Sequence, residues 1–208
     1  EINQYDYQSP LVILKKILKG LALDFFTFPP IFKPITYWIF RYGFLHDIGW
    51  INRQVEVELD LKLKNTIPSY YLARYTPFQA RLALAQLDRI DEEINIRNKK
   101  AMLYRKGLQD IPGLVLPPEL EDNIAYVYPV FPIQYSDRKR LLKWLMLHKR
   151  DAAAQHLKNC ADLPAFSAFW RDCPVARKTA NEVIVLPTYP RYPIAEIQKN
   201  IEVIRSYF

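Results

Sequence analysis

The sequence is poor in residues that build covalent or metal-linked sites. Of its 208 residues only two are cysteine, Cys160 and Cys173, and three are histidine. Two thiols at this spacing make neither a disulfide framework nor a zinc site, so we expect reduced thiols in a cytoplasmic protein. No uninterrupted apolar run reaches about 18 residues, and no cleavable signal peptide begins the chain. The sequence therefore predicts no transmembrane helix.

Acidic residues are also in the minority, with 22 Asp and Glu against 29 Lys and Arg, a net charge of +7. A basic chain suits nucleic acid, the phosphates of a nucleotide-linked sugar, or an anionic membrane surface. The sequence has no dense Lys/Arg block, zinc module or RNA-binding motif, so we predict no nucleic-acid partner. Half of the residues are apolar, which is ample for a core.

Glycine and proline are absent from Phe78 to Lys106, and a helix-start signal stands just before this stretch. Thr76 suits the N-cap, Pro77 the first helical position, and Gln79 the return contact of a capping box. We predict one helix reaching about Asp110. It would span about 45–50 Å and bridge two parts of a larger molecule. Its apolar face would contain Ala80, Leu84, Leu87, Ile94, Ala101, Tyr104 and Leu108.

The segment 10–45 is rich in aromatic and basic residues. We expect a first helix that Pro29-Pro30 must end, and a second over Thr36 to Leu45. Three interpretations stay open: a core or dimer-interface element of a longer protein, an element lying in a membrane interface, or a surface for a partner groove. The first helix can gather Leu11, Leu14, Leu18, Leu21 and Phe25 on one face. The charged residues are Lys15, Lys16, Lys19, Lys33 and Arg41, against Asp24 alone.

Short strands and helices alternate through the remainder. Gln54 to Lys64 alternates apolar and charged residues and predicts a half-buried strand. Ala125 to Gln134 predicts a strand that Pro129 and Pro132 place at an edge or bulge. A helix is expected after the caps Ser136 and Asp137, a strand at Val183 to Leu186, and a last helix from Pro193. This order predicts an α/β (α+β) domain of two layers, with helices over a small sheet.

The stretch 74–91, RYTPFQARLALAQLDRID, resembles the segment R-M-S-E-L-Q-A-A-L-G-L-A-Q-L-E-R-L-D of the DegT/DnrJ/EryC1/StrS family. Members of that family are pyridoxal-phosphate (PLP) sugar aminotransferases. The resemblance covers roughly Leu72 to Phe208. Further motifs follow in the family's order: Arg97 with Tyr104, Ile111–Leu114, Asp137-Arg138, Cys173–Ala176 and Leu186–Pro190.

The resemblance implies the small domain of the aspartate-aminotransferase fold, known as fold type I. We expect an apolar helical insertion at 1–53, a strand and linker at 54–70, and the long helix with the aminotransferase-like domain at 71–208. Because family members are nearly twice this length and the chain begins with Glu1, we interpret it as the C-terminal portion of a longer protein. The large PLP-binding domain, with its Schiff-base lysine, would then lie upstream of Glu1.

The resemblance also implies a homodimer with PLP in the full-length protein and a nucleotide-linked keto-sugar substrate, in cell-surface polysaccharide synthesis. Lys15, Lys16, Lys19 and Lys33 lack the context of the family's lysine. We therefore expect no catalytic residue, no bound cofactor and no activity in this chain alone.

One position departs from the family. Its N-x-R motif carries an Asn that binds the PLP phosphate of the neighbouring subunit, and Leu72 stands there. Leucine cannot donate a hydrogen bond. Arg74 remains, and it is open to two interpretations: binding a phosphate or carboxylate, or forming a structural ion pair.

Two further residues are candidate substrate contacts. His156 lies where the family carries a histidine segment near the substrate, or it is structural. Arg191, in Tyr189–Pro193, presents its charge to an anion, or the segment is only a rigid connection.

Two functional hypotheses follow from these observations. In the first, the chain is part of a working sugar aminotransferase. In the second, Leu72 and the aromatic, basic segment belong to a non-catalytic family member with a scaffold role or a peripheral contact with the inner membrane.

Overall fold

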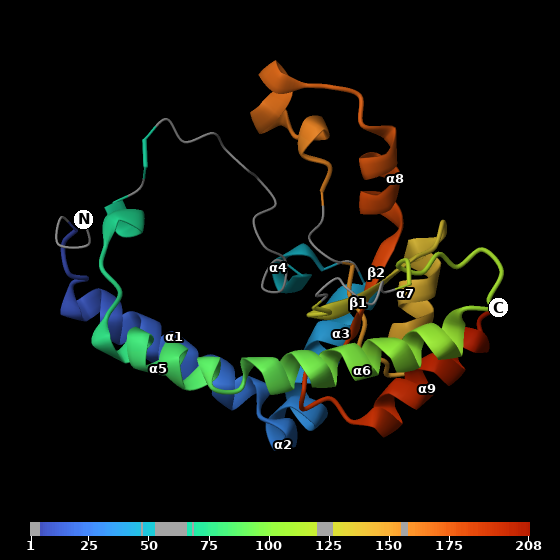
Figure 1. Cartoon of the computed structure of the whole chain (residues 1–208), viewed down its shortest axis with the longest axis horizontal. Helices are drawn as coiled ribbons and strands as arrows, with labels where there is room; N and C mark the ends of the chain where they lie inside the picture. The colour runs from blue at the N-terminus through green and yellow to red at the C-terminus, as the bar shows by residue number, and fades with distance from the viewer. Residues whose placement is uncertain (1–4, 47, 53–65, 68, 120–126, 155–157) are drawn as a thin grey trace. The chain divides into compact units, whose positions relative to one another are not determined.

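The computed structural model describes residues 5–46, 48–52, 66–67, 69–119, 127–154 and 158–208 (Figure 1). The predicted strand Gln54 to Lys64 lies outside them. The chain divides into two compact units, Glu1–Asp88 and Arg89–Phe208, and each is described by itself.

The first unit begins with α1 (Pro10–Thr27), followed by α2 (Pro29–Ile31), the π-helix η2 (Phe32–Thr36), α3 (Tyr37–Leu45) and α4 (Gly49–Asn52). The predicted break is confirmed, because α1 ends at Thr27, two residues before Pro29. The buried Thr36 closes the turn by donating its hydroxyl to the Phe26 carbonyl at 3.0 Å. No residue of α1 is buried.

The predicted capping box is confirmed at α5 (Pro77–Leu87), which follows the short 3₁₀ helix η3 (Ser69–Leu72). The Gln79 backbone N–H donates to Thr76 Oγ1 at 3.2 Å, and the Thr76 N–H donates to Gln79 Oε1 at 3.1 Å. Two of the amides that every helix start leaves unpaired are thereby satisfied.

The prediction of one long helix is wrong, because α5 ends at Leu87 and α6 (Ile90–Leu108) begins a new helix. Asp88 is a poor helix former, and Arg89 leaves helical geometry with φ −114° and ψ 0°. The first turn of α6 then carries three consecutive acidic residues, which favour a helix N-terminus. These are Asp91, Glu92 and Glu93.

The second unit contains a two-stranded antiparallel sheet of β1 (Val130–Gln134) and β2 (Val183–Pro187), with Pro132 opposite Val185. Gln134 exchanges two backbone hydrogen bonds of 2.9 Å with Val115. Its N–H therefore points away from β2, and so does the nitrogen of Pro132 two residues earlier. The missing proline donor faces the edge of the paired strands, as predicted.

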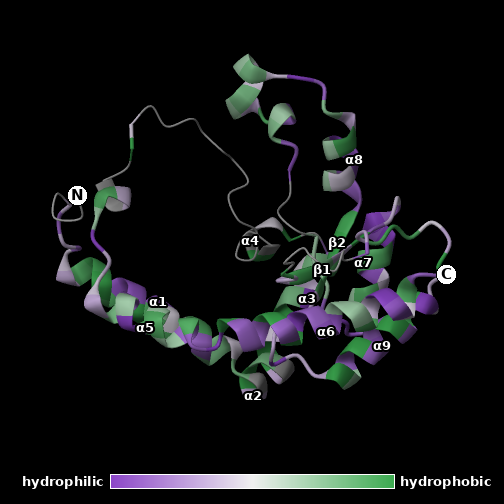
Figure 2. Ribbon diagram, in the orientation of Figure 1, coloured by the Kyte–Doolittle hydropathy of each residue, from purple (hydrophilic) through white to green (hydrophobic). Residues whose placement is uncertain are grey.

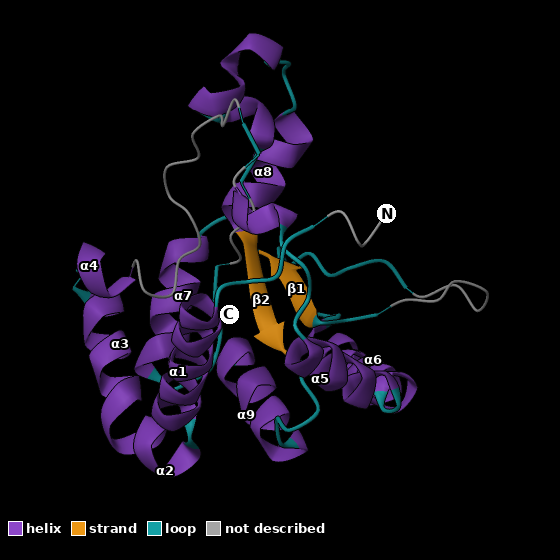
Figure 3. Cartoon of the chain, turned by 90° about the vertical axis from the view of Figure 1, so that its left-hand side faces the viewer, coloured by secondary structure: helices purple, strands orange, loops and turns teal. Residues whose placement is uncertain are grey.

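Three helices pack around this sheet: α6, α7 (Arg138–Leu147) and α9 (Ile194–Arg205). α6 contacts β1, α7 contacts β2, and α9 contacts both helices (Figure 3). The Asp137 carboxylate caps α7 by accepting from the Arg140 N–H at 3.2 Å. The predicted two-layer α+β arrangement is confirmed in this unit. The remaining elements are η4 (Cys160–Asp162), η5 (Pro164–Phe169) and α8 (Pro174–Glu182).

The core lies between the sheet and these helices. The rings of Tyr104 and Phe131 stack with centroids 5.5 Å apart. α6 and α9 approach closely at Gly107, because a Cβ there would lie 2.7 Å from Ile201 Cδ1. Fully buried apolar residues come from every layer: Tyr104, Leu108, Phe131, Ile133, Leu141, Leu145, Ile184, Leu186, Ile197 and Ile204.

Candidate functional site

Arg74 lies just before α5, and its side chain is occupied inside the first unit. Its Nε donates to the Tyr5 carbonyl at 2.5 Å, and Nη1 lies 3.1 Å from the Tyr7 hydroxyl. The guanidinium also covers the Tyr7 ring at 4.7 Å from the centroid. These contacts hold the N-terminal segment against the approach to α5.

Leu72 ends η3 and is 44% exposed. It presents no polar group at the position where the resembled family has its asparagine. His156 lies outside the residues that the structure describes.

Arg191 is exposed at the turn that joins β2 to α9. Lys100 on α6 holds the backbone of this turn in place. The buried Lys100 ammonium donates to the carbonyls of Tyr189 at 2.8 Å and Pro190 at 2.7 Å. Burial and then the neighbouring Arg97 charge lower the pKa of Lys100. The Lys100 ammonium therefore stabilises the fold by binding backbone carbonyls, whereas the Arg191 side chain is exposed to solvent.

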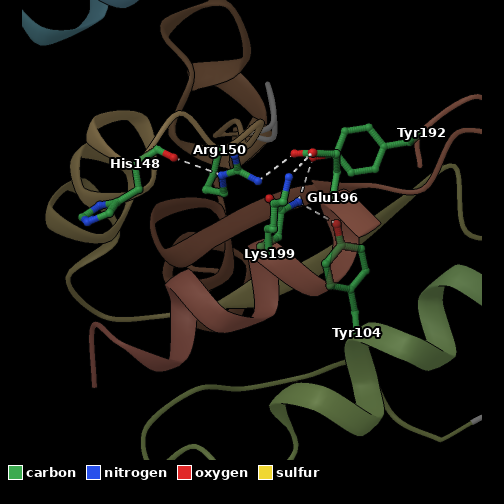
Figure 4. A network of polar contacts seen from close by, with 7 residues as sticks. Tyr104, His148, Arg150, Tyr192, Glu196 and Lys199 are labelled. Carbon is green, nitrogen blue, oxygen red and sulfur yellow. Dashed lines mark hydrogen bonds and ion pairs between the residues drawn. The ribbon is translucent and has the colours of Figure 1, made fainter. Parts of the chain in front are cut away.

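Asn200 fixes the same turn from α9. Its buried side-chain amide donates to the hydroxyls of Tyr104 at 2.9 Å and Tyr192 at 3.0 Å. Burial raises the pKa values of both tyrosines well above their ordinary range, against the opposing effect of the amide hydrogen bond. Figure 4 shows Tyr104 and Tyr192 among the side chains of the network.

Asp151 and Tyr189 form a second polar contact beside the turn. Part of Asp151 is exposed, but loss of water around its carboxyl raises the pKa, and a hydrogen bond from Tyr189 opposes the rise. Burial, with the Asp151 charge and hydrogen bond, raises the pKa of Tyr189 to about 12. The Tyr189 and Tyr192 rings meet edge to face at 5.2 Å.

Arg150 completes the network on the other side. It donates to the His148 carbonyl at 3.0 Å and pairs with Glu196 at 2.8 Å, and Lys199 pairs with the same carboxylate at 2.9 Å (Figure 4). The turn that carries the exposed Arg191 is thus bounded by polar groups with hydrogen-bond or ion-pair partners.

Three of the described lysines are placed differently from the free, enclosed amine of a Schiff-base site. Lys15 and Lys19 are exposed on α1, and Lys100 is held by two carbonyls. Leu72 cannot hold a phosphate. Among the described residues, no group of three or more His, Cys, Asp or Glu side chains is placed to hold a metal ion.

Sequence reasoning missed Lys100, Asn200 and Asp151. The signal for Asn200 was present, because it interrupts the apolar stripe of the last helix between Ile197 and Ile204. A polar residue at such a position needs a buried partner.

Comparison with known proteins identifies the family. The profile of the DegT/DnrJ/EryC1/StrS aminotransferase family matches residues 59–205. The chain belongs to this family. Most of the first unit, including α1 to α4, lies outside the match.

A curated relative within the sequence comparison is dTDP-4-dehydro-2,3,6-trideoxy-D-glucose 4-aminotransferase of Saccharopolyspora spinosa. It is 28% identical over 122 residues, which cover 57% of this chain and 31% of the relative. The match therefore spans about a third of that enzyme's length.

Three solved structures share the fold. S. venezuelae DesV has a TM-score of 0.60 at 21% identity, covering 70% of this chain and 40% of DesV. A DegT/DnrJ/EryC1/StrS aminotransferase from Brucella abortus has a TM-score of 0.59 at 23% identity, and the match covers 64% of this chain and 36% of that one. Helicobacter pylori PseC has a TM-score of 0.58 at 19% identity, and the match covers 74% of this chain and 42% of PseC. The predicted fold, the C-terminal part of a fold type I aminotransferase, is confirmed.

Proposed function

We propose that this chain is the C-terminal part of a PLP-dependent aminotransferase acting on a nucleotide-linked keto-sugar in cell-surface polysaccharide biosynthesis. The observation that carries the proposal is the family match over residues 59–205, joined to the fold of the second unit. The named activity of the Saccharopolyspora spinosa relative supports the substrate class.

The proposal places PLP and its Schiff-base lysine in a large domain outside these 208 residues, in a homodimer. When bound there, PLP supplies the electron sink that amino-group transfer requires. From the described lysines and Leu72 we infer that this chain assists catalysis and does not supply the catalytic residue. We expect the chain alone to show no aminotransferase activity when PLP and an amino donor such as glutamate are added.

The test uses the full-length parent protein isolated from its own source. Borohydride reduction followed by peptide mapping should find a pyridoxyl-lysine outside the 208 residues. A folded parent that gives no adduct with PLP supplied would overturn the aminotransferase proposal.

Within this function we propose Arg191 as the contact for an anionic group of the substrate. Arg74 is engaged with Tyr5 and Tyr7, whereas Arg191 is exposed on a turn whose backbone is fixed. Charge-assisted hydrogen bonds contribute about 1.5–3 kcal/mol, so Arg191→Ala should raise the parent's KM for the nucleotide sugar about 10- to 100-fold. Arg171→Ala, another exposed arginine of the same unit, serves as the control. A KM equal to that of the control would remove Arg191 from the site.

A non-catalytic family member is the second candidate, and Leu72 is the observation that favours it. A scaffold protein would fold and dimerise without the phosphate-binding asparagine. The borohydride experiment separates the candidates, because only the first requires a lysine adduct.

A further inference from the structure

The helix α1 exposes its apolar residues instead of burying them. Apart from the half-buried Ile13, the large apolar side chains of α1 are exposed, from 39% for Ile17 to 69% for Leu11. Six large apolar residues share one face of the helix: Leu11, Leu14, Ile17, Leu18, Leu21 and Phe25. In Figure 2 hydrophobic and hydrophilic residues alternate along this helix.

The charged residues of α1 lie outside this face. At about 100° per residue the six apolar residues occupy a sector of about 120° without a charge. Lys15, Lys16 and Lys19 fall together in a neighbouring sector, and Asp24 is the one acidic residue of α1. Lys16 also donates to the Gln8 side chain at 2.6 Å. α1 therefore has one apolar face without charges, and its lysines lie among the exposed Val12, Leu23 and Phe26 on the other side.

α3 adds amphipathic aromatic residues to the same unit. Trp38 and Tyr42 are exposed, and Arg41 covers the Trp38 ring at 5.1 Å. Tryptophan and tyrosine favour the boundary between water and hydrocarbon, where the ring is apolar and its polar group stays hydrated.

These helices lie before the family match, which begins at residue 59. The part of the chain that matches the family therefore does not include these helices. In the part of the chain that the structure describes, no helix is both long and apolar enough to cross a membrane. An amphipathic helix with basic residues beside its apolar face instead lies along a bilayer surface.

We propose that α1 binds the surface of an anionic lipid bilayer. Leu14, Leu18 and Leu21 enter the boundary of the hydrocarbon, and Lys15 and Lys19 meet the lipid phosphates. The helix lies parallel to the surface over about 27 Å. The charge of α1, three lysines against one aspartate, is complementary to an anionic bilayer, and its wide apolar face suits the boundary of the hydrocarbon. The inference is independent of transamination and goes beyond it.

The experiment measures cosedimentation of the purified full-length parent protein with vesicles, without added substrate. One set contains phosphatidylcholine alone, and the other contains about a third phosphatidylglycerol. We expect binding to the anionic set, at least tenfold weaker binding to the neutral set, and weakening as salt is raised.

Two double variants test the two sides of the helix. Leu14→Glu with Leu21→Glu should reduce binding more than tenfold, because each leucine loses its apolar contact. Lys15→Gln with Lys19→Gln should reduce binding to anionic vesicles about 30-fold and remove most of the salt dependence. None of these residues is buried, so folding should be retained, as circular dichroism would verify. Val175→Glu on the exposed surface of α8 is the matched control.

Three outcomes would overturn the proposal: no binding to either vesicle, equal binding to both, or full binding by the Leu14/Leu21 variant. A chain that ignores vesicles but dissociates from dimer to monomer in that variant would show that α1 is covered by a second copy. The borohydride experiment on the parent stays unaffected by any of these results.

Discussion

Gly107 is the point of closest approach between α6 and α9, and adding one methyl group there tests the packing of the second unit. A Cβ at position 107 would lie 2.7 Å from Cδ1, 2.8 Å from Cγ2 and 3.1 Å from Cγ1 of Ile201. The β-branched Ile201 has little freedom at χ1 in a helix, so its Cγ2 cannot simply rotate away.

Two effects of opposite sign determine the result of Gly107→Ala. At an uncrowded helix position, replacing glycine by alanine stabilises the helix by about 0.8–1 kcal/mol. Overpacking costs about 1–3 kcal/mol. We expect the overpacking to prevail and the free energy of unfolding to fall by about 1–2 kcal/mol.

Urea denaturation followed by circular dichroism measures this difference. In an Ile201→Ala background all three crowded atoms are gone, so adding Gly107→Ala should be neutral or stabilising by up to about 1 kcal/mol. Gly20→Ala in α1, where no atom lies within 4 Å, should raise helicity and serves as the control. If Gly107→Ala alone stabilises the chain, the inferred close approach is refuted.

Three further changes test the caps and polar contacts. Asn200→Ala should lower the free energy of unfolding by about 2–3 kcal/mol, because the Tyr192 hydroxyl loses a buried donor; unchanged urea midpoints would contradict this. Burial and then the Asp151 charge raise the pKa of Tyr189 to about 12. Stability should therefore fall as the pH rises from about 10, the unfolded value, towards 12. Asp151→Asn should lower the pKa of Tyr189, and so narrow the pH range over which stability falls. An alkaline absorbance titration of the tyrosines measures this pKa, and a titration curve identical to that of the unchanged protein would exclude the effect of Asp151 on Tyr189. Thr76→Ala should cost about 1 kcal/mol and speed amide exchange at the start of α5; unchanged exchange would argue against the cap.

Features specified by neighbouring residues were predictable from the sequence. The capping box of Thr76 and Gln79, the cap at Asp137, and the edge position of Pro132 depend on residues within one turn or strand. The local chemistry that sets them is visible in the order of the residues.

Two features were not predicted. The break between α5 and α6 contains neither glycine nor proline, and apolar residues keep a helical spacing across it at Leu87, Ile90 and Ile94. Lys100 looked like one charge among many on a long helix, yet its ammonium binds carbonyls about 90 residues away, at Tyr189 and Pro190. The family resemblance supplied the fold, but it gave no account of α1.

The contact of Lys100 with two successive carbonyls has a thermodynamic consequence for Arg191. A ligand that meets a loose loop must immobilise the backbone, and the lost freedom weakens binding. Here the backbone on one side of Arg191 is already held by α6, and Tyr192 on the other side by Asn200. An anion bound at Arg191 would therefore restrict little more than the Arg191 side chain. The entropy lost on binding would come from the rotamers of Arg191 and not from ordering of the whole turn.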